Sequence, residues 1–307
     1  MTIAGRPRRT SDLPATSHGI SRDAFTTGDW GLLTGIAAIW GSSFLFMAEG
    51  LDAFEPGVVT LARIGLGTLA LALIPRARTP IARSDRARVA LLGVTWFALP
   101  LILFPVAQQW IDSSVAGMIN GAVPITTAVW ATALMGALPG RRQLLGIAIG
   151  FAGVAAVFLP EIQDSSATAL GAGLILVAVT LYGLAANMAV PLQHRYGALP
   201  VLLRAQLVAL ALVTPLGLAQ LPGSSWAWSS ALAMLPLGML GTGLAFVLMT
   251  TLVGRVGGTR GAISIYFVPI VAVALGFLVR GETIHPLSLL GTALVLVGAW
   301  FTSRREA

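Results

Sequence analysis

The sequence contains no cysteine and no lysine, and charged residues occupy only 10% of its 307 positions. Without cysteine the chain can form no disulfide, no thiolate metal site and no cysteine nucleophile. Soluble domains carry roughly 25% charged residues, so this chain cannot cover a water-exposed surface. With 56% hydrophobic residues and a mean hydropathy of +0.85, it is predicted to be a polytopic membrane protein whose surface is solvated by lipid.

Long apolar runs fill most of the chain. A bilayer core about 30 Å thick needs roughly 20 apolar residues in a helix. The runs show no alternation and are too long for the strands of a membrane barrel. We therefore expect an all-α fold with ten transmembrane helices, at residues 30–48, 57–74, 89–108, 114–136, 142–159, 168–190, 199–219, 230–252, 260–279 and 286–302.

All nineteen basic residues are arginine, and the net charge is +7. Sixteen of them fall on one side of the expected membrane, Arg280 falls on the other, and two lie within spans. The positive-inside rule then places both termini in the cytoplasm. The basic charge is a topology signal, so no nucleic-acid partner is expected. Residues 1–29 look like a disordered cytoplasmic tail rather than a signal peptide, and 304–307 form the cytoplasmic C-terminus.

The chain repeats one passage. "AVPITTAVWATALMG" at 122–136 corresponds to "FVPIVAVALGFLVRG" at 267–281, with the prolines 145 positions apart (269 minus 124). Gly146 matches Gly291 in the same register, and Gly153 matches Gly298. Each half, 30–159 and 160–303, contains five spans, and five is odd. The two halves are therefore expected to be inverted repeats, an arrangement that many secondary transporters build around a site at the membrane midplane.

Further motifs resemble a known family. They are "WGSSF" at 40–44, "EPGVVTLAR" at 55–63, "AQQWIDSSVAGMINGAVP" at 107–124, "QLLGIAIGFAGV" at 143–154, "LYGLAANM" at 181–188, "GTGLAFVL" at 241–248, "AISIYFVPIVAVALGFLVRGE" at 262–282 and "LLGTALVLVGA" at 289–299. The chain thus resembles, over roughly residues 30–303, an EamA-type member of the drug/metabolite transporter superfamily. The resemblance implies ten helices, a bacterial inner-membrane location, and export or exchange of small organic metabolites. The family often has an acidic residue after the glycine that ends the fourth span of each half; Glu282 matches it, whereas Ala137 does not.

Two arginines lie inside the spans. Arg63 is about two turns into the second span and matches the family's second-span arginine. It could attract an anion or form a gate ion pair with Glu49, Asp52 or Glu55, or it could snorkel or pack at the helix end. Arg204 lies near the cytoplasmic end of the seventh span, where snorkelling is favoured over a gating role. Glu282 is a further gate candidate.

Pro124 and Pro269 each remove a backbone donor in mid-span. Exposed backbone at membrane depth is tolerated where it meets protein or a water-filled cavity. Because both prolines recur in the repeat, we expect two kinks beside a central cavity.

The substrate site is expected to be apolar and aromatic, with a few amide groups. An asparagine facing lipid would leave its hydrogen-bonding groups unused, so Asn120 and Asn187 should contact either substrate or a neighbouring helix. Gln108 and Gln109 are assigned to the interface. Aromatic residues in spans can also simply pack or form an interfacial belt. The aromatic candidates are Trp40, Phe44, Trp96, Tyr182 and Tyr266.

No Asp, Glu, His or Lys falls at the middle of an expected span. A proton-coupled pump usually needs such a group, so we expect facilitated export or exchange. The substrate is expected to be a small neutral or amphipathic solute such as a hydrophobic amino acid, and no cofactor or metal is expected. A multidrug exporter is the nearest alternative. A lipid-acting enzyme would need a convergent catalytic set that the spans lack, and a receptor without flux is the remaining class.

Overall fold

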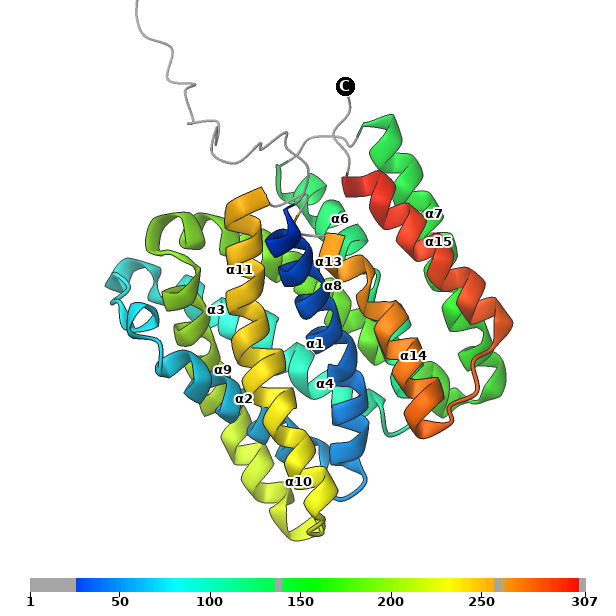
Figure 1. Ribbon diagram of the computed structural model, residues 1–307, viewed down its shortest axis with the longest axis horizontal. Helices are drawn as coiled ribbons and strands as arrows, with labels where there is room; N and C mark the ends of the chain where they lie inside the picture. The colour runs from blue at the N-terminus through cyan, green and yellow to red at the C-terminus, as the bar shows by residue number, and fades with distance from the viewer. Residues whose placement is uncertain (1–25, 136–139, 257–260, 262, 304–307) are drawn as a thin grey trace, which may run out of the picture.

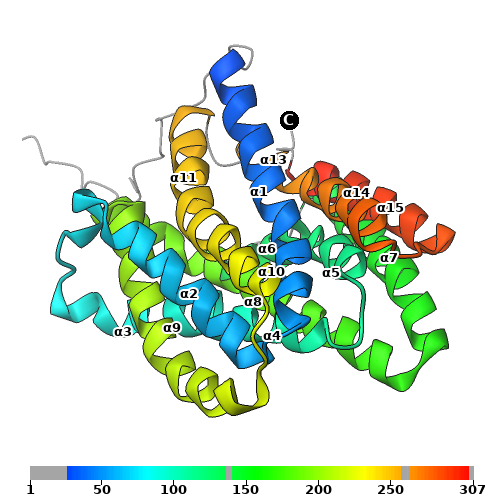
Figure 2. The same cartoon turned by 60° about the horizontal axis from the view of Figure 1, so that its bottom comes forward.

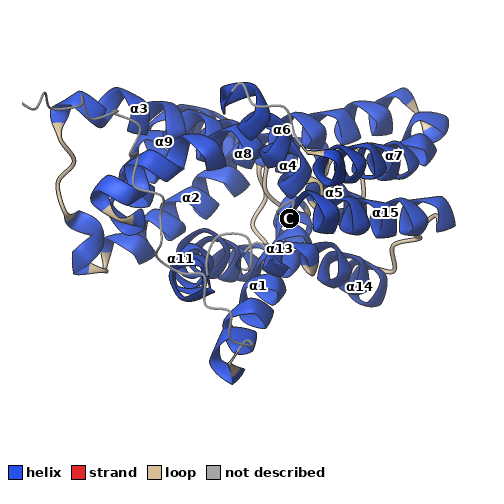
Figure 3. Cartoon of the chain, turned by 90° about the horizontal axis from the view of Figure 1, so that it is seen from above, coloured by secondary structure: helices blue, strands red, loops and turns tan. Residues whose placement is uncertain are grey.

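The computed structural model describes residues 26–135, 140–256, 261 and 263–303, and its regular elements in these ranges are all helical (Figure 1, Figure 3). Residues 1–25 and 304–307 of the expected tails lie outside the described part. In chain order the elements are α1 (Thr27–Leu51), α2 (Pro56–Ala72), η1 (Pro75–Arg78), η2 (Arg83–Asp85), α3 (Arg86–Leu92), η3 (Gly93–Ala98), α4 (Leu99–Ala107), α5 (Ser113–Asn120), α6 (Val123–Met135), α7 (Arg141–Asp164), α8 (Ser166–Tyr196), α9 (Ala198–Gln220), η4 (Leu221–Gly223), α10 (Trp228–Leu235), η5 (Pro236–Leu244), α11 (Ala245–Val256), α13 (Ile263–Tyr266), α14 (Val268–Arg280) and α15 (Pro286–Ser303).

These elements form ten spans, as the sequence predicts. Eight helical stretches are at least 18 residues long and apolar enough to cross a bilayer, and two shorter apolar helices, α2 and α15, complete the set. The third span of each half is built from successive segments: α3, η3 and α4 in the first half, and α10, η5 and α11 in the second. Helix α1 begins and α15 ends at the same face of the molecule, at the top of Figure 1. We call this the basic face, because the arginine-rich segments lie there, and the opposite one the acidic face.

The two halves meet along a glycine seam between α7 and α15, which lie side by side at one edge (Figure 1, Figure 2). A methyl group on Gly153 would lie 2.7 Å from the carbonyl oxygen of Gly291, and one on Gly298 would lie 2.6 Å from that of Gly146. The two contacts are equivalent, because Gly298 is the repeat partner of Gly153 and Gly146 is the repeat partner of Gly291, each 145 positions away. The seam therefore has the twofold relation that inverted repeats require.

Most other spans pack against the opposite half. A methyl group on Gly41 of α1 would lie 3.0 Å from the carbonyl oxygen of Val268 on α14, and one on Gly183 of α8 would lie 2.6 Å from the carbonyl carbon of Thr126 on α6. Such close backbone approach between spans requires small residues. The result is two mixed bundles. We group α1, α2, the span α10–η5–α11 and α13–α14 as bundle one, and the span α3–η3–α4, α5–α6, α8 and α9 as bundle two; the two bundles pack closely on each other through α2 with α9 and α14 with α5.

Helical irregularities recur at equivalent places. The fourth span of each half is interrupted just before its proline: Gly121 and Ala122 separate α5 from α6, and Phe267 separates α13 from α14. The third spans each contain a π-helical segment, η3 and η5, whose first residues are 143 positions apart (236 minus 93). Such segments are frequent at functional sites. Each fourth span thus has a short turn directly before Pro124 or Pro269, at the places where kinks were expected.

Candidate functional site

Arg63 lies buried in the second turn of α2, with 8% of its surface exposed. Because α2 begins at Pro56, seven residues earlier, the Arg63 backbone is about 10 Å below the acidic-face end of the helix. Its Nε donates a hydrogen bond to Thr242 Oγ1 of η5 at 3.0 Å, and its Nη1 lies 3.9 Å from Met47 Sδ. Tyr182 of α8, in bundle two, is near enough to interact electrostatically with the guanidinium.

Glycine allows η5 to approach α2 closely enough for this contact. A methyl group on Gly238 would lie 2.9 Å from the Arg63 carbonyl oxygen, and one on Gly67 would lie 2.7 Å from Thr242 Cβ. Thr242 is in turn fixed from bundle two, because Gln206 Nε2 of α9 donates to the Thr242 carbonyl oxygen at 2.8 Å. The three spans are thus joined by a polar network in a region where polar groups are costly.

The charge of Arg63 is not matched by the protein. A guanidinium has five N–H donors, and after the contacts with Thr242 and Met47 three have no partner in the part of the chain that the structure describes. Among the described residues no carboxylate forms an ion pair with Arg63. A buried cation without a counter-charge is costly in a membrane span, so Arg63 is a candidate for contact with an anionic group.

The gate ion pair expected between Arg63 and Glu49, Asp52 or Glu55 is not formed. Instead, Arg280 at the end of α14 donates hydrogen bonds to the carboxylates of Glu49 at 2.8 Å and of Asp52 at 2.9 and 3.0 Å. The physical reason is depth: Arg280 lies at the level of the α1 C-terminus, whereas Arg63 lies well below it. Arg63 does not snorkel either, since its head group is held by Thr242.

Two tryptophans and a phenylalanine meet between the bundles. Trp40 of α1 donates from Nε1 to the Gly241 carbonyl oxygen at 3.0 Å, and its ring lies 5.5 Å from that of Phe246. Trp96 of η3 meets the same Phe246 ring from bundle two at 5.8 Å. Both tryptophans are half-buried. Phe246, which the sequence analysis missed, joins these two candidates.

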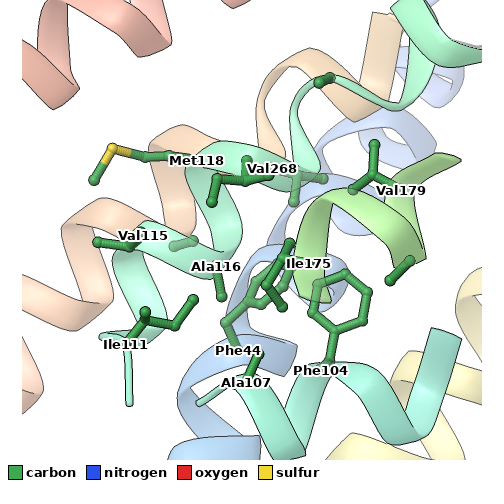
Figure 4. Close-up of a cluster of buried hydrophobic side chains, with 14 of the residues drawn as sticks. Phe44, Phe104, Ala107, Ile111, Val115, Ala116, Met118, Ile175, Val179 and Val268 are labelled. Atoms are coloured by element: carbon green, nitrogen blue, oxygen red, sulfur yellow. The ribbon is translucent and has the colours of Figure 1, made fainter. Parts of the chain in front are cut away.

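A second aromatic row contains Tyr182 and Phe44. The Tyr182 ring stacks on Phe104 at 5.9 Å, and Phe104 lies 5.6 Å from Phe44. Figure 4 shows Phe44 and Phe104 facing each other among buried side chains from α1, α4, α5, α8 and α14. Phe44 is buried in this cluster, whereas Tyr182 is half-buried and borders the Arg63 side.

Asn120 is the last residue of α5, directly before the break in the fourth span. It is half-buried, and its side chain has no hydrogen-bond partner among the described residues. Asn187 differs, because its Nδ2 donates to the carbonyl oxygens of Thr127 and Gly183 at 2.9 Å each. Asn187 therefore bonds between helices, one of the two alternatives weighed for it.

Tyr266 lies apart from the aromatic groups. Its hydroxyl donates to the Ala299 carbonyl oxygen of α15 at 2.7 Å, and only 8% of the residue is exposed. Tyr266 thus fastens α13 to α15. This placement favours a packing role over the substrate contact expected for it.

The remaining candidates lie at the ends of spans. Arg204 donates from Nη2 to the Arg78 carbonyl oxygen at 2.9 Å at the basic face. Glu282 is 9% exposed and accepts from the Ser113 and Ser114 backbone N–H groups at 3.0 and 2.9 Å. It thereby caps the start of α5 from the opposite bundle.

A cavity of about 520 Å³ opens at the acidic face. Gln108, which the sequence placed at the interface, lines it and also donates from Nε2 to the Phe44 carbonyl oxygen at 3.3 Å. Within the described ranges, no group of three or more His, Asp or Glu side chains could hold a metal ion. The polar residues that line the cavity are Asp52, Glu55, Gln108, Gln109, Ser225 and Arg280.

Ten spans in two inverted halves, with a polar network and aromatic side chains between mixed bundles, are typical of a multi-pass secondary transporter. The EamA-like transporter family matches residues 29–159 and again residues 169–304, so this chain belongs to that family. It is a membrane transporter for a small-molecule substrate and not an enzyme.

Several relatives are similar over nearly the whole chain. A "Probable terminal-alkyne amino-acid exporter" of Streptantibioticus cattleyicolor is 27% identical over 280 residues, covering 90% of this chain and 93% of that protein. The "Threonine/homoserine exporter RhtA" of Escherichia coli is 27% identical over 292 residues, covering 90% and 92%. The "Uncharacterized inner membrane transporter YedA" of Escherichia coli is 27% identical over 279 residues, covering 87% and 88%.

A solved crystal structure shares the fold. It is 15% identical, with a TM-score of 0.64, and the match covers 90% of this chain and 97% of the other.

Proposed function

We propose that this protein exports or exchanges small amino acids or similar amphipathic carboxylates. The observation that carries the proposal is Arg63, a buried guanidinium with three unpartnered N–H donors and no carboxylate partner among the described residues. An arginine presents its N–H groups in a planar fork that matches a carboxylate. Because Nε donates to Thr242 and one Nη1 N–H contacts Met47 Sδ, three N–H groups on Nη1 and Nη2 remain for the substrate.

The neighbouring side chains suit the rest of such a substrate. Ligand sites combine apolar and aromatic walls with a few placed polar groups. Trp40, Trp96 and Tyr182 are half-buried and supply the aromatic walls, and the unpartnered Asn120 amide offers a polar contact at the helix break. Two of the relatives carry names of amino-acid exporters, which supports the same substrate class.

The two bundles suit alternating access. Arg63 and Trp40 belong to bundle one, and Tyr182 and Trp96 belong to bundle two, so a substrate between them would bridge both. Rocking of one bundle against the other would expose this place to each side in turn. Because no Asp, Glu, His or Lys lies at mid-span, we infer facilitated export or exchange rather than proton coupling.

The domain division follows the repeats, with halves at 30–159 and 160–303. We place the basic face and both termini in the cytoplasm and the protein in the bacterial inner membrane. Support comes from the sixteen arginines on one side and from the inner-membrane relative YedA.

Counterflow in proteoliposomes tests the proposal. Vesicles are preloaded with a mixed amino-acid pool, and uptake of labelled threonine and labelled hydrophobic amino acids is followed. We expect exchange by the wild type, a loss of at least about tenfold in Arg63→Gln, and weakened exchange in Trp40→Ala and Asn120→Ala. The control is Arg204→Gln, which removes an equally charged residue whose hydrogen bonds within the described ranges go to backbone carbonyl oxygens of the α2–α3 connection. Absence of exchange by folded wild type, or equal loss in the control, would overturn the assignment.

A further inference from the structure

The connection between α2 and α3 is a folded segment rather than a loose loop. It contains the short helices η1 and η2, and Ala77 and Ile81 within it are buried in the core that includes α9. Arg204 of α9 donates to the carbonyl oxygens of Ala77, Arg78 and Thr79 at 3.5, 2.9 and 3.3 Å. The segment is therefore fastened to bundle two at several points.

This segment carries a surplus of positive charge that the protein does not neutralise. Residues 75–88 contain five arginines and one aspartate, a net charge of +4. That aspartate, Asp85, is 3% exposed and bound by Arg195 Nη1 at 2.8 Å and by the Tyr196 hydroxyl at 2.6 Å. The negative charge of Asp85 is thus already neutralised by an arginine of α8 and does not offset the free arginines.

Three of the five arginines are free. Arg76, Arg83 and Arg86 are exposed, and their side chains have no hydrogen bond or ion pair within the described part of the chain. The other two are partly engaged: Arg88 contacts Asp85 at 3.5 Å, and Arg78 donates from Nε to the Ala72 carbonyl oxygen at 2.6 Å. We call Arg76, Arg83 and Arg86 the arginine platform.

Exposed leucines flank the platform in the sequence. Leu73, the C-cap residue directly after α2, is 64% exposed, and Leu91 on α3 is 49% exposed. Exposed leucines on spans face lipid tails, so the arginines between them lie where the apolar surface ends. Figure 2 and Figure 3 show the α2–α3 connection at the outer margin of the molecule, away from the α7–α15 seam.

We propose that the arginine platform binds the phosphate head group of an anionic phospholipid, such as phosphatidylglycerol, in the leaflet at the basic face. The inference does not depend on the transported substrate, and it takes that face to be the cytoplasmic one. Guanidinium groups bind phosphate oxygens bidentately, and each basic residue near an anionic surface contributes about 1 kcal/mol. Since α2 carries Arg63, the bound lipid would also stabilise the helix that holds the candidate site.

Native mass spectrometry of the detergent-solubilised full chain tests this. Equal amounts of phosphatidylglycerol and phosphatidylcholine are added, and the bound lipids are counted for the wild type, for Arg76→Gln/Arg83→Gln/Arg86→Gln, and for Arg141→Gln/Arg142→Gln. The last variant removes two exposed arginines from the start of α7 at the same face. We expect the wild type to bind phosphatidylglycerol at least about fivefold more than phosphatidylcholine, the platform variant to lose most of this preference, and the control to keep it.

Equal binding of both lipids by the wild type, or equal loss in both variants, would overturn the proposal. Inorganic phosphate is added in a separate arm: if millimolar phosphate displaces the lipid, the platform is a free-anion site and the proposal fails. Each variant must melt within a few degrees of the wild type. If the triple variant does not, the single variants Arg83→Gln and Arg86→Gln replace it, with the same expected direction. Transport of any substrate does not enter these readouts.

Discussion

Arg63 and Thr242 lie 179 positions apart in the sequence and are joined by a hydrogen bond of 3.0 Å from Nε to Oγ1. The bond fixes the direction of a buried guanidinium that has three N–H groups without a partner among the described residues. Thr242 is itself held by Gln206 from bundle two. The charge that we assign to substrate binding is therefore oriented by one span from each bundle.

Thr242→Val should weaken substrate binding while leaving the protein folded. Valine keeps the shape of threonine but cannot accept from Arg63, and a hydrogen bond to a charged group contributes about 1.5–3 kcal/mol. We expect the half-saturating substrate concentration in counterflow to rise about tenfold or more. Thr250→Val is the matched control, because Thr250 Oγ1 bonds only to the Val247 carbonyl oxygen of its own helix. Equal effects of the two substitutions would contradict the role of Thr242.

A glycine-to-alanine change should destabilise the protein within the α7–α15 seam and stabilise it outside the seam. In Gly153→Ala the new methyl group would lie 2.6 Å from Val295 N and 2.7 Å from the Gly291 carbonyl oxygen, so the helices must separate. We expect a loss of about 2 kcal/mol or more, measured as a lowered melting temperature in detergent. Gly173→Ala on α8 meets nothing within 4 Å and should stabilise by about 0.5–1 kcal/mol. A Gly153→Ala protein as stable as wild type would contradict the seam.

Asp112, which precedes α5, should make the unfolding free energy of the protein depend on pH. Partial burial raises the pKa of Asp112 above its ordinary value of 3.8, the nearby Glu282 carboxylate raises it further, and Arg280 opposes both. Because the pKa is higher in the folded state, the ionised carboxylate lowers stability at neutral pH, and this cost vanishes as the pH falls through the folded pKa.

Asp112→Asn should therefore raise the melting temperature at pH 7.5, by less than the equivalent of about 1 kcal/mol because the carboxylate is only partly buried and is screened by solvent. Asparagine serves equally well at a helix N-cap, so the change removes only the charge. The gain should shrink as the pH is lowered toward 4. A gain that stays constant between pH 7.5 and pH 4 would show that charge is not its cause.

The absence of cysteine makes the orientation directly measurable. Single cysteines introduced as Ser84→Cys in η2 and as Ser166→Cys at the start of α8 lie at opposite faces and at exposed positions. In intact cells, a membrane-impermeant maleimide should label Ser166→Cys and leave Ser84→Cys unlabelled until the cells are opened. The reverse pattern would invert our assignment of the basic face.

Hydropathy and the 145-residue register were sufficient to predict ten spans in two inverted halves. Gly153 and Gly298 show why: the same close helix contact is required twice, so the same small residue recurs in the sequence. The packing of each half against the other was not predicted. Apolar residues facing lipid and apolar residues facing protein have similar hydropathy, so nothing in the run around Gly41 identifies Val268 as its neighbour.

The sequence singled out Arg63, Trp40, Trp96 and Tyr182 because charge and aromatic rings are conspicuous in apolar spans, and their role in substrate binding stays a prediction. Thr242 and Gln206 were missed, although a glutamine in mid-span is itself a polar signal that a search restricted to ionisable groups overlooks. Ion pairs and hydrogen bonds between helices depend on the depth of each residue in the membrane, which sequence spacing alone does not define. This explains why Arg280 rather than Arg63 pairs with Glu49 and Asp52.

A substrate-by-variant comparison tests most directly whether Arg63 binds a carboxylate. Competition in counterflow is measured with an amino acid and with its carboxamide, in wild type and in Arg63→Gln. We predict that the wild type prefers the carboxylate at least about tenfold, which corresponds to about 1.4 kcal/mol, and that Arg63→Gln loses this preference. If Arg63→Gln keeps the full preference for the carboxylate, Arg63 is not the binding group and the central claim is contradicted.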